Sequence, residues 1–254
     1  MSVAASGPLH GLRVLVTRPA HQADAICRLV EQRGGKALLL PLLAIVPVPH
    51  AASVARQLEN ARSYDWWIFT STNAVQQARK LVAENWPARL AAVGAATAAA
   101  LESGGLSVTT PQGAYSSEGL LALPQFQDVN GQTILLVTGE GGLEVLAPTL
   151  RGRGAQVDVA AVYRRVPLPY AGEHVAAQLR ACDAIIITSG EALLHLLRIT
   201  PLATHAALLR KQLVVPGTRV LDKAVELGFR SPLMPEKMSD AAIIHTLEQA
   251  SRPT

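Results

Sequence analysis

The sequence QVDVAAVYRRVPLP, residues 156–169, joins two similar halves of the chain and contains one tyrosine, Tyr163. Apolar residues recur at every second position from residue 157 to residue 162, which predicts an extended strand. Pro167 and Pro169 then exclude a helix, because proline breaks the helical hydrogen-bond pattern. We therefore expect a crossover strand between two lobes, with Tyr163 near its end.

The two halves share the pattern D-x-x-I-x-T-S-x-x-A, which starts at Asp65 in the first half and at Asp183 in the second. The offset of roughly 120 residues is too long for a solenoid repeat and indicates duplication of a whole α/β lobe. Further pairs of similar segments follow in the same order: residues 14–18 with 134–139, 20–34 with 143–154, and 93–105 with 215–228.

Short apolar runs alternate with helical patterns along the chain, which is typical of βαβ units and a parallel sheet. Several of the predicted helices are followed by glycine, a common helix stop. We expect strands at residues 13–18, 36–40, 65–71, 90–94, 107–109, 134–139 and 183–189. We expect helices at residues 20–33, from 51, from 72, at 95–103, at 116–123 with Ser116 or Ser117 as its cap, and at 143–153.

Composition limits the possible functions. Of the 254 residues, 49% are apolar and 17% are charged, enough apolar material for two buried cores. The formal net charge of +4 is small and scattered, so we expect no nucleic-acid partner, although this charge suits an acidic small molecule. The longest apolar run is broken by prolines, so we expect no membrane partner.

Cysteine usage and the first residues point to the cytoplasm. Cys27 and Cys182 have no spacing that suggests a disulfide, and we interpret both as buried free thiols in a reducing compartment. The first residues lack the apolar segment of a secretion signal. We therefore expect a cytoplasmic protein, and by default a monomer.

Most familiar site patterns are missing from the sequence. The seven histidines show no metal-ligand spacing, so we expect no metal. Residues 139–142, GEGG, form an incomplete dinucleotide-binding motif, and we interpret these glycines as the start of a helix. No G-x-S-x-G motif is present, which argues against a hydrolase. We expect no cofactor.

Polar loops follow the predicted strands at their carboxyl ends, the edge where ligands bind in open α/β sheets. Helix N-termini at that edge attract carboxylate and phosphate groups. For any single hydroxyl the alternative is a plain helix cap, but five such loops favour an extended anionic ligand held by two lobes. The loops are Thr17-Arg18-Pro19, Thr70-Ser71-Thr72-Asn73, Gly139-Glu140-Gly141, Thr188-Ser189-Gly190 and Gly217-Thr218-Arg219.

Six motifs in this order resemble the uroporphyrinogen-III synthases. They are VLVTRP (14–19), D-x-W-I-F-T-S-x-N-A-V (65–75), A-V-G-x-x-T (92–97), A-V-Y-R-R (161–165), T-S-G (188–190) and S-D-A-A-I-I (239–244). The resemblance implies one α/β lobe from residues 1–42 plus 168–254 and another from 50–160. Residues 43–49 and 161–167 would join the lobes as a two-stranded antiparallel ribbon, and their prolines favour edge strands.

The resemblance also implies an activity: cyclisation of hydroxymethylbilane to uroporphyrinogen III, with inversion of the last pyrrole ring and loss of water, in haem biosynthesis. Such an enzyme is a lyase without a cofactor. Tyr163 takes the place of the family's active-site tyrosine, since a protonated phenol can hydrogen-bond the departing hydroxyl group. The alternative for a strand tyrosine is packing at an interface.

The residues that we expect to bind substrate lie in the polar loops or in the quoted motifs. They are Thr17, Arg18, Ser71, Thr72, Asn73, Gly94, Thr97, Gly139, Thr188, Ser189, Gly190, Gly217 and Thr218. The second glycine loop departs from the family pattern, because the family's threonine has either moved or gone. Thr218 is the candidate to replace it, and Arg219 is a candidate carboxylate contact; neither role follows from the motif. Arg18 and Arg164 are further candidate counterions for carboxylates, although Arg164 also fits a solvated surface.

Two other hypotheses stay open at this point. A non-catalytic two-lobed protein that binds an anionic small molecule would carry similar loops, because fold alone does not define function. A nucleotide-dependent transferase is less favoured, because the glycine motif at residues 139–142 is incomplete.

Overall fold

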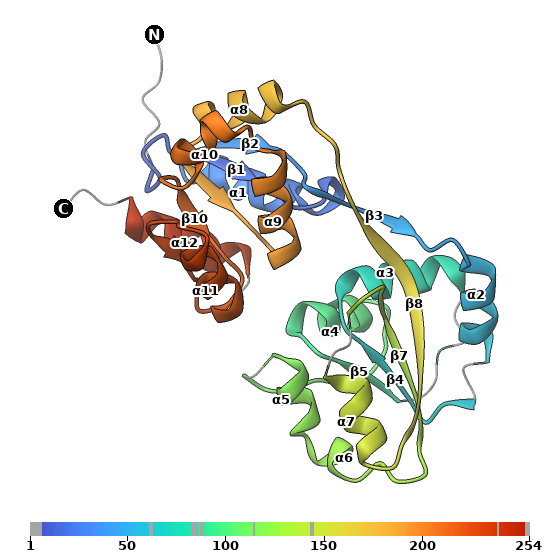
Figure 1. The fold of residues 1–254 in the computed structure, drawn as a ribbon. Helices are drawn as coiled ribbons and strands as arrows, with labels where there is room; N and C mark the ends of the chain where they lie inside the picture. Colours follow the sequence, from blue (N-terminus) through green and yellow to red (C-terminus); the bar gives the residue numbers. More distant parts are fainter. Residues whose placement is uncertain are drawn as a thin grey trace. The chain divides into compact units, whose positions relative to one another are not determined.

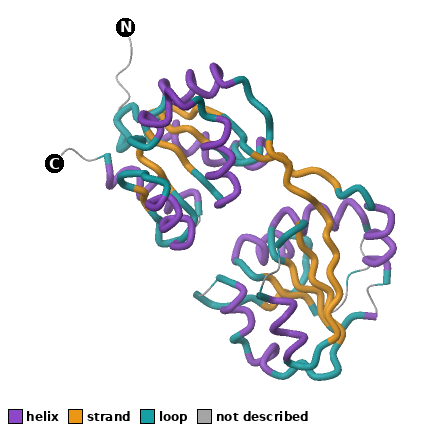
Figure 2. The backbone as a smooth tube through the Cα atoms, viewed as in Figure 1, coloured by secondary structure: helices purple, strands orange, loops and turns teal. Residues whose placement is uncertain are grey.

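The computed structural model describes residues 7–251 apart from 61–62, 83–85, 87–88, 114, 143–144 and 238. The chain divides into two compact units. The first unit combines the segments Met1–Ala44 and Val166–Thr254, and the second is Ile45–Arg165. In each unit helices flank one β-sheet (Figure 1, Figure 2).

The sheet of the first unit is parallel throughout, as the alternation of strands and helices predicts. Its strand order is β11-β10-β9-β1-β2. The strands are β1 (Arg13–Val16), β2 (Lys36–Leu39), β9 (Ala184–Ile186), β10 (Gln212–Val214) and β11 (Pro232–Leu233). The helices are η1 (Ala20–Gln22), α1 (Asp24–Gln32), α8 (Gly172–Ala181), α9 (Gly190–Ile199), α10 (Leu202–Leu208), α11 (Thr218–Glu226) and α12 (Asp240–Ala250).

The sheet of the second unit has the order β3-β8-β7-β4-β5-β6, and the pairs from β8 to β6 are parallel. Its strands are β3 (Leu43–Pro47), β4 (Trp66–Phe69), β5 (Leu90–Ala92), β6 (Val108–Thr109), β7 (Thr133–Gly139) and β8 (Gln156–Pro167). The helices are α2 (Ala51–Glu59), α3 (Thr72–Leu81), α4 (Ala95–Glu102), α5 (Ser117–Leu121), α6 (Pro124–Gln127) and α7 (Leu146–Gly152). Leu143, where we expected the last of these helices to begin, lies outside the described residues.

Each sheet is buried on both faces, which explains why its strands are continuous apolar runs. In β1, Leu15 packs into the core on one face, while Val14 and Val16 pack into the core on the other. In the second unit, Trp67 and Ile68 of β4 divide in the same way. Both cores of a unit therefore depend on one sheet.

The repeated pattern has the same structural role in both units. Asp183 accepts a hydrogen bond from the backbone N–H of Arg13 at 3.0 Å, and Asp65 accepts one from the backbone N–H of Thr133 at 2.8 Å. In each case the aspartate precedes the central strand and fixes the first residue of the neighbouring strand. The duplication predicted from the sequence thus extends to individual contacts.

The two expected linker segments form parts of strands β3 and β8. These strands are hydrogen-bonded neighbours, and β3 carries the chain into the second unit while β8 carries it back (Figure 1). The expectation of two edge segments is correct for β3, which is the last strand of its sheet. For residues 161–167 it is wrong only at the start of the segment, because the pairing of β8 with β7 ends at Tyr163. Pro167 is tolerated because it is the last residue of β8.

The cysteines are both free, but they differ in burial. Cys182 is buried in the core of the first unit, as expected. Cys27 is only partly buried, because the residues of α1 that point into the core are Ile26 and Val30. The expectation of a buried thiol is therefore wrong for Cys27. Burial raises the pKa of the Cys182 thiol to about 11.

Candidate functional site

Tyr163 and Ser71 meet at the carboxyl edge of the second unit's sheet. Ser71 lies between β4 and α3, and Tyr163 lies near the end of β8. The phenol oxygen of Tyr163 is 3.1 Å from Ser71 Oγ, and either atom can be the donor. The tyrosine ring packs into the core with Phe69 and Ala74, and the residue is only 4% exposed. A hydroxyl group at the end of a fixed ring is thereby held at the start of a helix.

Ser71 has a second contact that limits the direction of its own proton. Its Oγ accepts the backbone N–H of Ala74 at 3.1 Å and so caps α3. A serine hydroxyl has one proton and two lone pairs, so Ser71 can still donate to Tyr163. In that arrangement the proton of the tyrosine is available to another acceptor.

Thr70 and Thr138 form a second hydroxyl pair at the same edge. Thr70 Oγ1 donates to Thr138 Oγ1 at 2.8 Å, and Thr138 is buried. This bond joins the carboxyl ends of β4 and β7, next to Ser71 and Gly139. Thr70 belongs to one of the polar loops singled out in the sequence but is not among the residues expected to bind substrate, and Thr138 was missed, although it directly precedes Gly139.

The next loop along this edge leads into α4. Gly94 is the N-cap of α4, and a Cβ built there would meet no atom within 4 Å. Its backbone is extended, so neither conformation nor packing within the unit requires glycine. Thr97 is buried in the first turn, while Thr72 and Asn73 occupy the first turn of α3 and are partly buried. The helix N-termini of α3 and α4 favour an anion here.

The interpretation of the glycines at residues 139–142 as helix-opening residues is wrong. Gly139 is the last residue of β7, and Gly141 is in a turn with φ of 75°. The following helix, α7, begins only at Leu146. Gly139 pairs with Tyr163 across the sheet, so its position is determined by strand pairing. Arg164, next to Tyr163, is exposed.

The first unit presents a related edge. Ser189 caps α9 by accepting the N–H of Ala192 at 3.1 Å, and Thr188 and Gly190 beside it are partly buried. Thr17 is buried, with Oγ1 donating to the carbonyl of Ile186 at 2.6 Å. The hydroxyl of Thr17 therefore joins β1 to β9 within the unit.

Arg18 forms an ion pair with an acidic residue of its own unit, Asp240. Its guanidinium is 2.5 Å from Asp240 at the start of α12, and its side chain is 14% exposed. Ser239 caps the same helix by accepting the N–H of Ala242. The sequence motif S-D-A-A-I-I thus has a structural explanation as a helix cap with an ion pair.

Gly217 and Thr218 begin α11 of the first unit. Gly217 is the N-cap, has an extended backbone, and leaves open space at its Cα. Thr218 is exposed, and its Oγ1 lies 3.9 Å from the sulfur of Met234. Arg219 is also exposed, and with Gly190 it lines a hollow of about 1020 Å³ between α9 and α11. Thr218 and Arg219 are thus both exposed at the start of α11.

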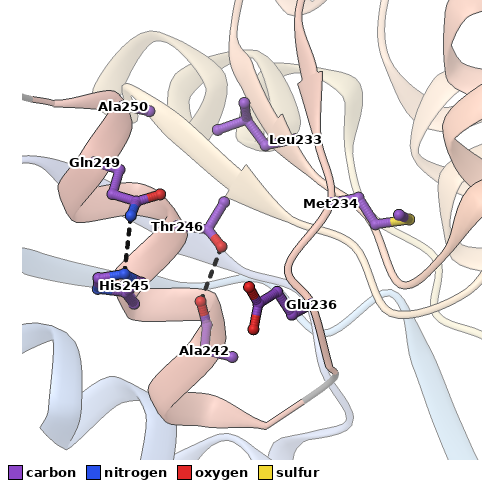
Figure 3. Close-up of a pocket in the computed structure, with 8 residues that line it drawn as sticks. All are labelled: Leu233, Met234, Glu236, Ala242, His245, Thr246, Gln249 and Ala250. Carbon is purple, nitrogen blue, oxygen red and sulfur yellow. Dashed lines mark hydrogen bonds between the residues drawn. The ribbon is translucent and has the colours of Figure 1, made fainter.

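Another hollow, of about 510 Å³, lies between β11 and α12 (Figure 3). None of the predicted site residues lines it. Its lining residues are Leu233, Met234, Glu236, Ala242, His245, Thr246, Gln249 and Ala250.

Within the described residues, no group of three or more His, Cys, Asp or Glu side chains could hold a metal ion. No helix in that part of the chain is long and apolar enough to cross a membrane.

Comparisons with known proteins agree with the motifs. Residues 24–245 match the family model described as uroporphyrinogen-III synthase HemD. The chain is 30% identical over 246 residues to the uroporphyrinogen-III synthase of Salmonella typhimurium, covering 93% of this chain and 100% of that protein. It is 30% identical over 247 residues to the Escherichia coli enzyme, with the same coverage.

Solved structures are similar in fold. A mutant uroporphyrinogen-III synthase from Thermus thermophilus aligns with a TM-score of 0.63 and 24% identity, covering 94% of this chain and 98% of that one. The Helicobacter pylori uroporphyrinogen-III synthetase aligns with a TM-score of 0.62 and 16% identity, covering 95% and 100%.

Proposed function

The chain belongs to the uroporphyrinogen-III synthase family, and on that premise we propose how its own residues carry out the reaction. It is an enzyme of tetrapyrrole biosynthesis, a cyclising lyase that acts on a small molecule. We propose hydroxymethylbilane as that molecule. The product would be uroporphyrinogen III, formed with inversion of the last pyrrole ring and loss of water.

Tyr163 is the proposed catalytic residue. The substrate loses a hydroxyl group, and a phenol that hydrogen-bonds this group makes the carbon–oxygen bond easier to break. The observation that carries the proposal is the 3.1 Å contact between Tyr163 Oη and Ser71 Oγ. With Ser71 donating to Tyr163, the phenol proton is directed to the leaving hydroxyl group. The carbon–oxygen bond breaks, the hydroxyl group departs as water with that proton, and the pyrrole nitrogen stabilises the cation left on carbon. The proton released when the ring closes returns to the phenolate.

The polar loops are the proposed carboxylate-binding elements. The bilane carries acetate and propionate chains, which helix N-termini and hydroxyl groups bind well. In the second unit the starts of α3 and α4, with Ser71, Thr72, Asn73, Gly94 and Thr97, serve this purpose. In the first unit the starts of α9 and α11 supply Thr188, Ser189, Gly190, Gly217 and Thr218.

Gly94 and Gly217 support this assignment in a similar way. Each is an N-cap with extended backbone and open space around its Cα, so the unit itself does not require glycine there. Close approach of a ligand to the backbone N–H groups is a reason for glycine at such a position. Thr17 and Arg18 act mainly by holding this edge of the first unit in place, through Ile186 and Asp240.

Positioning accounts for most of the proposed catalysis. Free bilane closes spontaneously to the isomer without inversion, so the enzyme has to hold the terminal ring in the orientation that leads to inversion. No cofactor takes part in this proposal. We also propose that the enzyme works as a cytoplasmic monomer.

The direct test is product analysis. The purified chain is incubated with hydroxymethylbilane, the products are oxidised, and the uroporphyrin isomers are separated. Isomer III is expected in excess over a control without protein. Formation of isomer I alone, together with measurable binding of the bilane, would instead support a non-catalytic binding protein.

A further inference from the structure

Gly139 lies directly against the ring of Tyr163. A Cβ atom at residue 139 would be 2.5 Å from Tyr163 Cζ and 2.9 Å from its Oη. Favourable carbon–carbon contacts are about 3.5–4.0 Å, so any side chain at this position would push the phenol away. Gly139 does not have a positive φ, and therefore its backbone would accept alanine. The space taken by the tyrosine ring is what requires glycine.

The pairing of β7 with β8 changes register at this point. The strands pair residue by residue from Thr133 with Gln156 to Thr138 with Ala161, and the next pair is Gly139 with Tyr163. Val162 is therefore an extra residue in β8, a β-bulge. Because successive side chains of a strand point to opposite faces, one extra residue reverses the face of every side chain that follows.

Burial along β8 agrees with this reversal. Ala160, Val162 and Tyr163 pack into the same core as Ala74 of α3, whereas Val157 packs into the core on the other face. Without the extra residue, Tyr163 would share the face of Val157, away from α3. The bulge thus turns the tyrosine to the face where Ser71 begins α3.

We propose that Gly139 and the bulge at Val162 are positioning features for Tyr163: the bulge selects the face, and the missing side chain of Gly139 lets the phenol reach Ser71. The proposal rests on the catalytic role proposed above for Tyr163. It gives Gly139 a role through the tyrosine instead of contact with the substrate. In the first unit, the corresponding residue after the strand threonine is Arg18, whose side chain pairs with Asp240.

The test is Gly139→Ala, with Gly152→Ala as the matched control. Gly152 is in α7 of the same unit, and a Cβ there would meet nothing within 4 Å. The turnover number kcat for isomer III is expected to fall by about 100-fold in Gly139→Ala, the effect of misplacing a catalytic group by about 1 Å. KM should change little, because the substrate-binding loops are untouched. Gly152→Ala should keep the kcat and KM of the wild type.

Double variants separate positioning from other roles. Gly139→Ala added to Tyr163→Phe should lower kcat no further, because the phenol is already gone. A further loss of more than about 10-fold would mean that Gly139 acts by another route and would overturn the proposal. Should Gly139→Ala fold poorly, Tyr163→Ala in the same chain should restore the melting temperature to that of Tyr163→Ala alone. Failure of this rescue would also overturn it.

The outcomes also distinguish this proposal from the one on which it rests. If Tyr163→Phe had the kcat of the wild type, the proposed catalytic role of Tyr163 would be refuted. A slow Tyr163→Phe together with a Gly139→Ala variant as fast as the wild type would refute the positioning role alone.

Discussion

Ser71 and Ser189 occupy equivalent places in the two units, with φ and ψ of −161° and 158° for Ser71 and −160° and 157° for Ser189. Each accepts a backbone N–H three residues later at 3.1 Å. Of these two serines, only Ser71 has a tyrosine hydroxyl as a further partner within the described part of the chain. The duplication thus produced two similar helix caps, and one of them, Ser71, also hydrogen-bonds the phenol of Tyr163.

Replacing Ser71 with alanine should affect both stability and catalysis. Loss of the α3 cap should destabilise the fold by about 1 kcal/mol. Loss of the contact with Tyr163 should lower kcat by roughly 10-fold or more, because the phenol is no longer held in one orientation. Chemical denaturation and isomer-resolved kinetics measure the two effects.

Ser116→Ala is the matched control for that variant. Ser116 caps α5 in the same unit by accepting the N–H of Gly119 at 3.1 Å, and it has no place in the proposed site. Its loss should cost a similar free energy of unfolding and leave kcat unchanged. Equal kcat values for the two variants would show that Ser71 is only a helix cap.

Asp183 should make the first unit sensitive to acid. Hydrogen bonds from Arg13 hold the pKa of the Asp183 carboxyl below its usual value. The native state then binds a proton less readily than the unfolded chain, so the stabilisation is complete above about pH 4 and is lost as pH falls through the lowered pKa. Because the Asp183 side chain is 36% exposed, we expect Asp183→Asn to cost only about 1 kcal/mol at pH 7.

Urea unfolding at several pH values checks this expectation. The difference in unfolding free energy between wild type and Asp183→Asn should shrink below pH 4. Arg13→Gln should lose less stability, because the backbone N–H of Arg13 still donates to the carboxylate. A difference that stays constant from pH 7 to pH 2 would contradict the assignment.

The two cysteines should differ in reactivity. Burial raises the pKa of the Cys182 thiol to about 11, and its side chain is fully buried, so little reactive thiolate is available at pH 8. Cys27 is partly exposed and should react first with a disulfide reagent. In native protein about one thiol per chain should react quickly with the reagent, whereas in unfolded protein both thiols should react quickly. Equally fast labelling of both thiols in the native state would be inconsistent with the burial of Cys182.

Much of the fold is encoded locally. The pattern from Asp65 to Ala74 and its copy from Asp183 contain the strand-clamping aspartate, the apolar strand and the capping serine in one short segment. For this reason the α/β class, the duplication and most elements could be predicted. The glycines that follow helices, such as Gly34 and Gly105, also have the positive φ expected of a helix stop.

The site depends on contacts that no local pattern contains. Ser71 and Tyr163 are 92 residues apart, and their meeting requires both the strand order and the bulge. A bulge depends on how two strands pair, so the sequence of β8 alone predicts regular alternation. In the same way, the local sequence around Arg18 does not indicate that its side chain pairs with Asp240, 222 residues away.

The most direct test of the account is the reaction of Tyr163→Phe with hydroxymethylbilane, compared with the wild type by separation of the oxidised uroporphyrin isomers. The wild type should form isomer III. Tyr163→Phe should form isomer III at least about 100-fold more slowly, so that the spontaneous isomer I predominates, while its melting temperature changes little. Formation of isomer III by this variant at the wild-type rate would contradict the central role given to the phenol.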